Sequence, residues 1–213
     1  AIQNKGVAIV NGVTPKGAPN ANGGWPSYAV NNTGTMTITD SEITSYHGGV
    51  ASYESGAVVT MNNTNIDMTG IPGFTSHGIY TYNGGAVTVN GGNIAKNATD
   101  QNATGASVIN GAVTVNSGTF TGRIENYYGT PVLRGGSYSV KPNKNFIAAG
   151  YKAVESDGRF YVVAENVKAV ASTEAEIKNA AAAGGTIVVA AGEYTLPASS
   201  IVAGTTLVCE EGT

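Results

Sequence analysis

The stretches GTMTITDSEI at residues 34–43, AVVTMNNTNI at 57–66, GAVTVNGGNI at 85–94 and GAVTVNSGTF at 111–120 align with one another without gaps. A weaker fifth copy, GTPVLRGGSY, follows at 129–138. Recurrence of one short unit along a chain is the signature of a repeat architecture. Because the unit is constant and the spacing between copies varies, we expect a fixed strand and turn joined by connections of variable length.

Three columns of this alignment are apolar. They contain Met36, Val59, Val87, Val113 and Pro131; Ile38, Met61, Val89, Val115 and Leu133; and Ile43, Ile66, Ile94, Phe120 and Tyr138. The first two columns lie two residues apart, which is the alternation of a strand with one face pointing inward. We therefore expect all three columns to face a common core.

Two polar columns accompany the apolar ones. The column between the two strand positions is expected to face outward and contains Thr37, Thr60, Thr88, Thr114 and Val132. The column directly after the strand contains Thr39, Asn62, Asn90, Asn116 and Arg134, so three of its five residues are Asn. Asn tolerates turn conformations, and stacked side-chain amides can hydrogen-bond from one copy to the next. A ladder of such bonds is expected at this turn.

These columns predict an all-β protein, folded as a right-handed parallel β-helix, a solenoid, with a short capping helix near residues 173–183. The Gly, Thr, Val and Asn content disfavours helical repeats, since these residues are poor helix formers. An antiparallel sandwich is the alternative, because short strands separated by Gly and Asn turns produce a similar pattern.

Three segments are expected along the chain. Residues 1–31 form an N-terminal irregular or capping segment that holds a short apolar strand at 7–10, and residues 32–163 carry the repeats and end in a hairpin at Ser156-Asp157-Gly158. Residues 164–213 begin a second β-helix module that is truncated or completed by another chain. Its helix is predicted by a capping box, Thr173 followed by Glu176, and by Gly184 at its end.

Composition excludes several classes of function. The 213 residues include 11 Lys and Arg and 14 Asp and Glu, so charged residues make up 12%, about half the usual share. The basic residues are scattered, which argues against nucleic-acid binding, and no apolar run reaches the length of a membrane span. The single cysteine, Cys209, excludes an internal disulfide framework and is expected to pack as a small apolar side chain. No metal or other cofactor is predicted.

The C-terminal region resembles a known family. EAEIKNAAAAGGTIVVAAGEYTL at 174–196 with ASSIVAGTTLVCEEGT at 198–213 is similar to the opening of pectin-lyase-like right-handed β-helix proteins. SGTFTG at 117–122, GGSYSV at 135–140 and AAGYKAVESDGRFYVV at 148–163 resemble repeat ends in surface-exposed and phage-encoded proteins of gut bacteria. The resemblance implies an extracellular location, on a virion or a bacterial surface. It also implies a homo-oligomer, with a trimer among its forms, or contact with virion or cell-surface neighbours.

Candidate ligand-binding residues are aromatic and fall between the repeat copies. They are Tyr46, Tyr53, Phe74, Tyr80, Tyr82, Tyr127 and Tyr128. Sugar rings have apolar faces that stack on such side chains, so this set suggests contact with a surface glycan or receptor.

The strongest acid-base candidate is the pair Glu54 and His77, which follow the third apolar column at the same offset in consecutive copies. Loops of different length need not superpose, so solvated loop residues are the competing interpretation. No catalytic residue is assigned.

Two functions follow. The first is a non-enzymatic structural or adhesion protein, part of a phage virion fibre or a bacterial surface adhesin, that contacts glycans through its tyrosines. The alternative is a carbohydrate-active β-helix, a polysaccharide lyase, glycoside hydrolase or phage depolymerase, whose catalytic part is missing or lies beyond residue 213.

Overall fold

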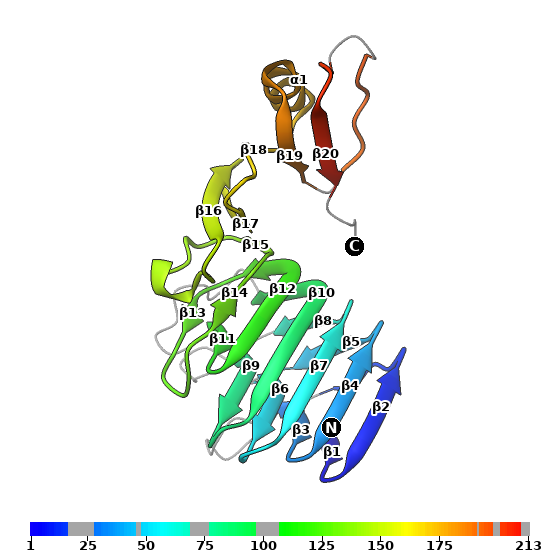
Figure 1. Ribbon diagram of the computed structural model, residues 1–213. Coiled ribbons are helices and arrows are strands. Elements are labelled where there is room, and N and C mark those ends of the chain that lie inside the picture. The colour runs from blue at the N-terminus through cyan, green and yellow to red at the C-terminus, as the bar shows by residue number, and fades with distance from the viewer. Residues whose placement is uncertain are drawn as a thin grey trace.

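A computed structural model describes residues 1–16, 28–45, 48–68, 77–96, 107–190, 192–197 and 201–209. The described chain is mostly β, with parallel sheets and one α-helix, and its elements follow one another as Figure 1 shows. The all-β expectation is confirmed at this level. No helix of the described residues combines the length and the apolar character needed to cross a membrane.

The first sheet, sheet A, contains six strands in the order β1-β3-β6-β9-β11-β13, and every neighbouring pair is parallel. Its strands are β1 (Ile2–Asn4), β3 (Tyr28–Asn32), β6 (Gly48–Tyr53), β9 (His77–Tyr82), β11 (Ser107–Asn110) and β13 (Ile124–Glu125). Except for β1 and β3, which precede the first copy, these strands lie between the repeat copies, in stretches that the alignment treats as connections.

The second sheet, sheet B, contains the repeat copies. One row of it is formed by β2 (Val7–Asn11), β4 (Thr35–Thr39), β7 (Val58–Asn62), β10 (Ala86–Lys96), β12 (Val113–Thr121) and β14 (Val132–Leu133). A second row is formed by β5 (Glu42–Ser45), β8 (Asn65–Met68), the later halves of β10 and β12, and β15 (Ser137–Tyr138).

The chain visits these positions in a fixed order. Strand β3 in sheet A is followed by β4 and β5 in sheet B, and β6 is followed in the same way by β7 and β8. We call one such passage a layer. Paired strands begin already at Ile2, because β1 and β2 pair with β3 and β4. Parallel layers therefore start ahead of residue 32, where the sequence pattern places the first repeat.

The register confirms the alignment in the apolar columns, and it shifts by one residue at the turn between the two halves of β10, where Asn90 pairs with Ser117. Val59 pairs with Met36 on one side and with Val87 on the other, and Val87 pairs with Val113. The degenerate fifth copy keeps the register, since Leu133 pairs with Val115. A one-residue slip would turn a strand's apolar set to the solvent, so the inward columns hold this register in place.

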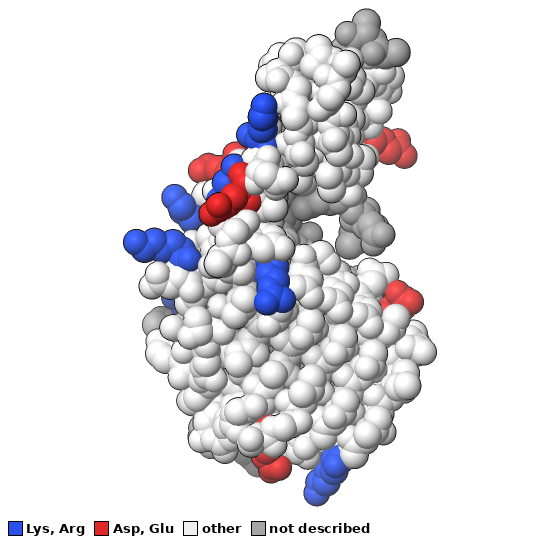
Figure 2. Space-filling model, in the orientation of Figure 1, with Lys and Arg blue, Asp and Glu red and all other residues white. Residues whose placement is uncertain are grey.

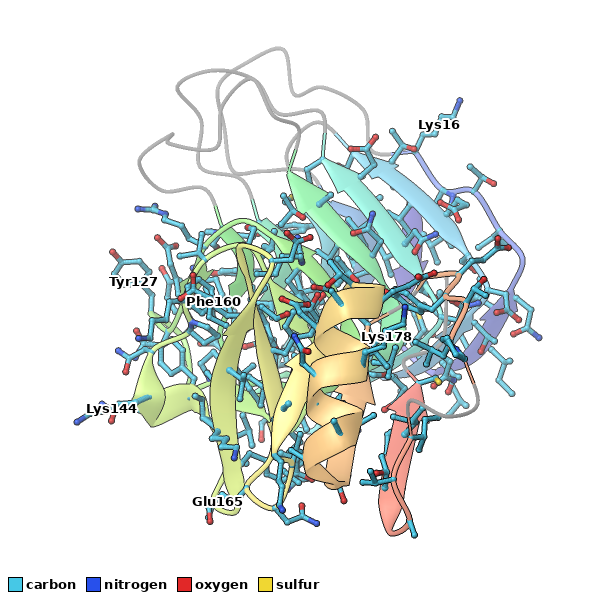
Figure 3. The ribbon with its side chains drawn as sticks, turned by 90° about the horizontal axis from the view of Figure 1, so that it is seen from above. Lys16, Tyr127, Lys144, Phe160, Glu165 and Lys178 are labelled. Carbon is cyan, nitrogen blue, oxygen red and sulfur yellow. The ribbon has the colours of Figure 1, made fainter. Side chains whose placement is uncertain are left out.

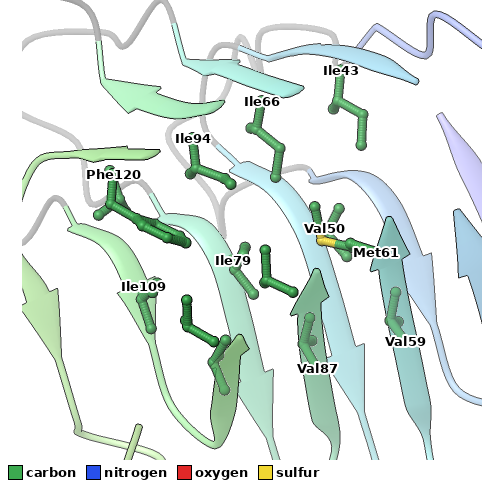
Figure 4. Close-up of a cluster of buried hydrophobic side chains, with 14 of the residues drawn as sticks. Ile43, Val50, Val59, Met61, Ile66, Ile79, Val87, Ile94, Ile109 and Phe120 are labelled. Carbon is green, nitrogen blue, oxygen red and sulfur yellow. The ribbon is translucent and has the colours of Figure 1, made fainter. Parts of the chain in front are cut away.

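The core lies between the two sheets and is formed by the apolar columns. Figure 4 shows Ile43, Ile66, Ile94 and Phe120 from one column converging on Val59 and Met61 from the others. Sheet A closes this core with an apolar column that the sequence analysis did not identify. Its members are Val30, Val50, Ile79 and Ile109, all fully buried.

The predicted amide ladder is present at the turn after the first strand of each repeat. The Nδ2 group of Asn62 donates to Thr39 Oγ1 at 3.3 Å, Asn90 donates to Asn62 Oδ1 at 2.9 Å and Asn116 donates to Asn90 Oδ1 at 2.8 Å. The side-chain amides of Asn62 and Asn90 thus each donate to the layer on one side and accept from the layer on the other.

The C-terminal part follows an antiparallel hairpin, β16 (Tyr151–Ser156) and β17 (Arg159–Ala164), whose turn contains Asp157 and Gly158 as predicted. Then come β18 (Ala169–Ala171), α1 (Glu174–Ala183), β19 (Gly185–Val189) and β20 (Thr205–Cys209), and the three strands form a parallel sheet. A short 3-10 turn, η2 (Lys144–Phe146), precedes the hairpin.

The helix prediction is confirmed. Thr173 caps α1 by accepting a hydrogen bond from the Glu176 backbone N–H at 3.2 Å, and the Glu176 carboxylate accepts from the Ser172 backbone N–H at 2.9 Å. The expectation that Cys209 packs as an apolar side chain is wrong: its thiol is exposed, because β20 ends the described sheet and packs on one side only.

Candidate functional site

Five tyrosines gather on the outer side of sheet A. We call them the tyrosine cluster, and they are Tyr28 from β3, Tyr53 from β6, Tyr80 and Tyr82 from β9, and Tyr128 from the turn after β13. Strand alternation explains the position of three of them, because Tyr80 neighbours the inward-facing Ile79 and so points away from the core, and Tyr82 and its register partner Tyr53 lie two positions further along.

The rings are arranged around Tyr80. Tyr28 stacks on it with centroids 5.5 Å apart, and Tyr82 lies parallel to it at 6.3 Å. Tyr128 meets Tyr80 edge-on at 5.4 Å and Tyr82 at 5.0 Å, while Tyr53 meets Tyr80 at 5.8 Å. These are the offset-stacked and edge-to-face geometries that aromatic pairs favour.

Small residues in β6 make this arrangement possible. Gly48 lies between Tyr28 and His77 in the register, and a Cβ at Gly48 would overlap the Tyr28 ring. The ring can therefore cross the intervening strand and reach Tyr80, two strands away. Ala51, at the register position facing Tyr80, is likewise too small to fill the space.

The cluster has a buried base and an exposed rim. Tyr28 and Tyr80 are 2% and 5% exposed, whereas Tyr82 and Tyr128 are 38% and 43% exposed. Burial raises the pKa of Tyr53 to about 12 and also raises the pKa values of Tyr28 and Tyr80. These three phenols stay neutral near pH 7, so they offer apolar ring faces and O–H donors but no charge.

His77 forms the polar end of the cluster. Its ring stacks on Tyr80 at 5.3 Å, with an interplanar angle of 8°. Asn110 Oδ1 accepts the Tyr127 backbone N–H at 3.1 Å, which turns the Asn110 Nδ2 group toward His77 Nε2 at 3.4 Å. Nε2 is therefore the unprotonated nitrogen, and Nδ1 donates to Ser107 Oγ at 2.8 Å.

Burial lowers the pKa of His77 to about 4. The N–H donor of Asn110 also lowers the pKa of His77, because a proton added to Nε2 would face an N–H group. His77 is thus a neutral, fully hydrogen-bonded side chain near pH 7. It stacks on Tyr80 and contacts Asn110, and Asn110 in turn holds the backbone N–H of Tyr127.

The structure does not bring Glu54 and His77 together. His77 pairs with Gly48 at the start of β6, whereas Glu54 follows Tyr53 at the other end of that strand. Six residues of strand separate the two positions, or about 20 Å at the usual rise. The two residues follow the third apolar column by the same number of positions, but they do not occupy equivalent positions on neighbouring strands. The reason is that the connections contain strands with a register of their own. Glu54 is exposed and lies in a turn with φ 80°.

The aromatic candidates divide into three groups. Tyr53, Tyr80, Tyr82 and Tyr128 belong to the cluster, and the first three lie in strands, so their assignment to variable connections is wrong. Tyr127 is 77% exposed and points away from the molecule (Figure 3) without joining the cluster. Tyr46 and Phe74 lie outside the described residues. Sequence reasoning missed Tyr28 and placed His77 with the wrong partner.

Charge is scarce on the front of sheet B. Figure 2 shows an uncharged face over β2, β4, β7 and β10, with charged groups at its margins. The predicted outward Thr column lies on this face, where Thr60 pairs with Thr37 and Thr88. Within the described ranges, no three His, Cys, Asp or Glu side chains come close enough together to hold a metal ion.

Comparison of the chain with protein-family models, with curated protein sequences and with solved structures finds no match.

Proposed function

We propose that the described residues between 1 and 147 form a right-handed parallel β-helix, a solenoid of the pectin-lyase-like kind, with the hairpin and α1 leading into a second module of this type. Support comes from the register, in which equivalent residues of successive layers pair in parallel through β4, β7, β10 and β12. The amide ladder at a constant turn gives independent support.

We further propose that the protein is a non-enzymatic structural and adhesion protein, part of a phage virion fibre or of a bacterial surface, that contacts glycans through the tyrosine cluster. The observation that carries this proposal is the position of Tyr82 and Tyr128, two partly exposed rings held by a buried base. A platform already ordered by its neighbours loses little conformational entropy when a ligand stacks on it.

The chemistry of the cluster suits a sugar. Pyranose rings present C–H faces to aromatic rings, and their hydroxyls require donors and acceptors at the edge of the contact. The phenol groups of the cluster and the amides of neighbouring turns supply such groups without a charge. The proposed partners are surface glycans or receptors, with copies of the same chain in a homo-oligomer such as a trimer, outside the cell.

A glycan array probed with the labelled chain tests the proposal. A chain carrying Tyr82→Ala and Tyr128→Ala should lose binding at least about fivefold, which corresponds to about 1 kcal/mol of stacking. Val58→Ala is the matched control, since Val58 has the same exposed fraction as Tyr82 and lies on sheet B. It should leave binding unchanged.

Two results would overturn the adhesion proposal. Binding that is equal in the wild type and in the double variant would remove the cluster from the interaction. Release of new reducing ends or unsaturated sugars from a polysaccharide by the purified chain would instead favour the carbohydrate-active alternative.

A further inference from the structure

The turn between β9 and β10 contains Asn83 followed by Gly84, a pair in which the asparagine side chain can react with the next backbone nitrogen. Glycine favours this reaction, because it has no Cβ to hinder the approach of its nitrogen. The same pair occurs at Asn11-Gly12, Asn90-Gly91 and Asn110-Gly111, and at Asn22-Gly23, which lies outside the described residues. The described sites share one chemistry, so their surroundings in the structure decide which of them reacts.

At Asn83 both reacting groups are free. Asn83 and Gly84 are exposed, and neither the Asn83 side chain nor the Gly84 N–H has a hydrogen-bond partner among the described residues. The bond that closes the turn joins two other groups, the Gly85 N–H and the Tyr82 carbonyl oxygen, at 3.0 Å. The Asn83 side chain can therefore approach the Gly84 nitrogen without either group first giving up a hydrogen bond.

The other described sites must break hydrogen bonds before they react. The Gly12 N–H donates to the Thr39 carbonyl oxygen at 3.1 Å. The Asn90 amide is held on both sides by the amide ladder. Asn110 is only 1% exposed, and its Oδ1 accepts from the Tyr127 backbone N–H at 3.1 Å. The need to break a single hydrogen bond of average strength slows such a reaction about fivefold.

We propose that Asn83 is a site of spontaneous modification, at which the folded chain converts its own amide to a carboxylate. The Gly84 nitrogen attacks Asn83 Cγ, and a bond forms between them. The Cγ–Nδ2 bond breaks, and Nδ2 leaves as ammonia with the proton of the Gly84 N–H. Water then opens the resulting succinimide ring. Opening at Cγ gives aspartate, and opening at the main-chain carbonyl gives isoaspartate, whose backbone runs through the former side chain.

The product places a new negative charge beside an existing one. Tyr53 and Tyr82 are register partners, so the residues that follow them, Glu54 and Asn83, occupy the same position in two stacked turns. The Glu54 N–H donates to the Tyr82 carbonyl oxygen at 3.1 Å, and both turn residues have positive φ, 80° and 50°. Like charges that face each other on neighbouring strands are destabilising. The modification should therefore weaken the contact between two layers beside the exposed Tyr82 of the tyrosine cluster.

The test uses the full chain, incubated folded in neutral buffer and, in a parallel sample, unfolded in guanidinium chloride. The incubation ends when the unfolded sample has converted half of its Asn-Gly pairs, and peptide mass spectrometry with electron-transfer fragmentation then measures aspartate and isoaspartate at each site. In the folded chain Asn83 should convert at least about fivefold faster than Asn11, and more than about tenfold faster than Asn90 and Asn110. In the unfolded chain these four sites should convert at similar rates.

Two substitutions measure the effect of the new charge. Asn83→Asp should lower the melting temperature by about 1 to 2 °C near pH 7, because its carboxylate faces that of Glu54. Glu54→Gln is the matched control: combined with Asn83→Asp it removes the facing charge and should restore the melting temperature of the wild type.

Three results would overturn the inference. The first is an unmodified Asn83 in the folded chain at the end of the incubation. The second is conversion of Asn11, Asn90 or Asn110 in the folded chain at the rate of Asn83 or faster, because hydrogen-bonded groups would then react as readily as free ones. The third concerns the new charge: equal melting temperatures of the wild type and the Asn83→Asp variant would overturn the repulsion from Glu54.

Discussion

Acidification should destabilise this protein through His77 in a narrow pH window. In the folded chain His77 is 4% exposed, stacked on Tyr80 and hydrogen-bonded as the neutral ring, and its pKa is lowered to about 4 by burial. In the unfolded chain the ring regains a pKa of about 6.5. Between these two values the unfolded state binds a proton that the folded state does not, so stability falls as the pH falls.

The magnitude follows from the two pKa values. The interval from 6.5 down to about 4, at roughly 1.4 kcal/mol per pH unit, gives a loss of about 3 kcal/mol. The contribution is fully present above pH 6.5 and fully lost below pH 4. For a chain of this size, about 3 kcal/mol corresponds to a fall in melting temperature on the order of 6 to 12 °C.

The assay is urea unfolding followed by circular dichroism at pH 7.5, 6, 5 and 4, for the wild type and for His77→Gln. Glutamine keeps a polar side chain opposite Ser107 and cannot titrate. Between pH 7.5 and 4 the wild type should therefore lose about 3 kcal/mol more unfolding free energy than the His77→Gln variant. Taking the difference between the two chains removes the contribution of carboxylates such as Glu176, whose pKa is lowered by hydrogen bonds from Ser172. Parallel pH profiles for the two chains would refute the reasoning.

Two further predictions concern the stacking of layers. Gly92→Ala should lower the free energy of unfolding in urea by about 3 kcal/mol or more, because Gly92 has φ 97° and a Cβ would overlap the Thr64 backbone. The control Gly6→Ala, with open space around the Cβ, should lower it by less than about 0.5 kcal/mol. Equal costs would contradict the close approach of layers. Asn62→Ala breaks two ladder bonds and should lower the free energy of unfolding by about 1 to 2 kcal/mol, while Asn116→Ala breaks one exposed bond and should cost less than about 1 kcal/mol; the reverse order would show that the ladder does not stabilise the stack.

The sequence predicts sheet B well, because its residues repeat in type as well as in position. Inward Val, Ile and Met, outward Thr and a turn Asn recur at fixed spacing, and each is set by contact with the layers on either side. Even the copy with Pro131 and Arg134 keeps its place, since Leu133 and Tyr138 still fill the core columns.

Sheet A was missed for a physical reason. The stretches of sequence that separate its strands from the repeat copies vary in length, so no gap-free alignment can find them. A signal exists nonetheless: Val30, Val50 and Ile79 are each followed two positions later by Asn32, Ser52 and Thr81, all buried polar residues at the strand end.

The candidate site was predicted in composition but not in arrangement. Tyr53, Tyr80 and Tyr82 were found as aromatic residues, but their meeting depends on Gly48, whose missing side chain lets Tyr28 cross a strand. Such a contact is made between layers, and neither residue type nor spacing along the chain encodes it.

The central claim is that equivalent residues of successive copies lie side by side in parallel register. A disulfide tests it most directly: in a Cys209→Ser background, Thr60→Cys and Thr88→Cys place two thiols on the outer face of neighbouring strands. Paired strands bring the Cα atoms to about 4.8 Å, within the reach of a disulfide. The pair Thr37→Cys and Thr88→Cys, two strands apart, is the control.

Mild oxidation of the folded chain should link residues 60 and 88 within one molecule, as read by peptide mass spectrometry, and should leave residues 37 and 88 unlinked. Failure of the 60–88 link in a folded chain, or equal linking of both pairs, would contradict the stacked parallel register.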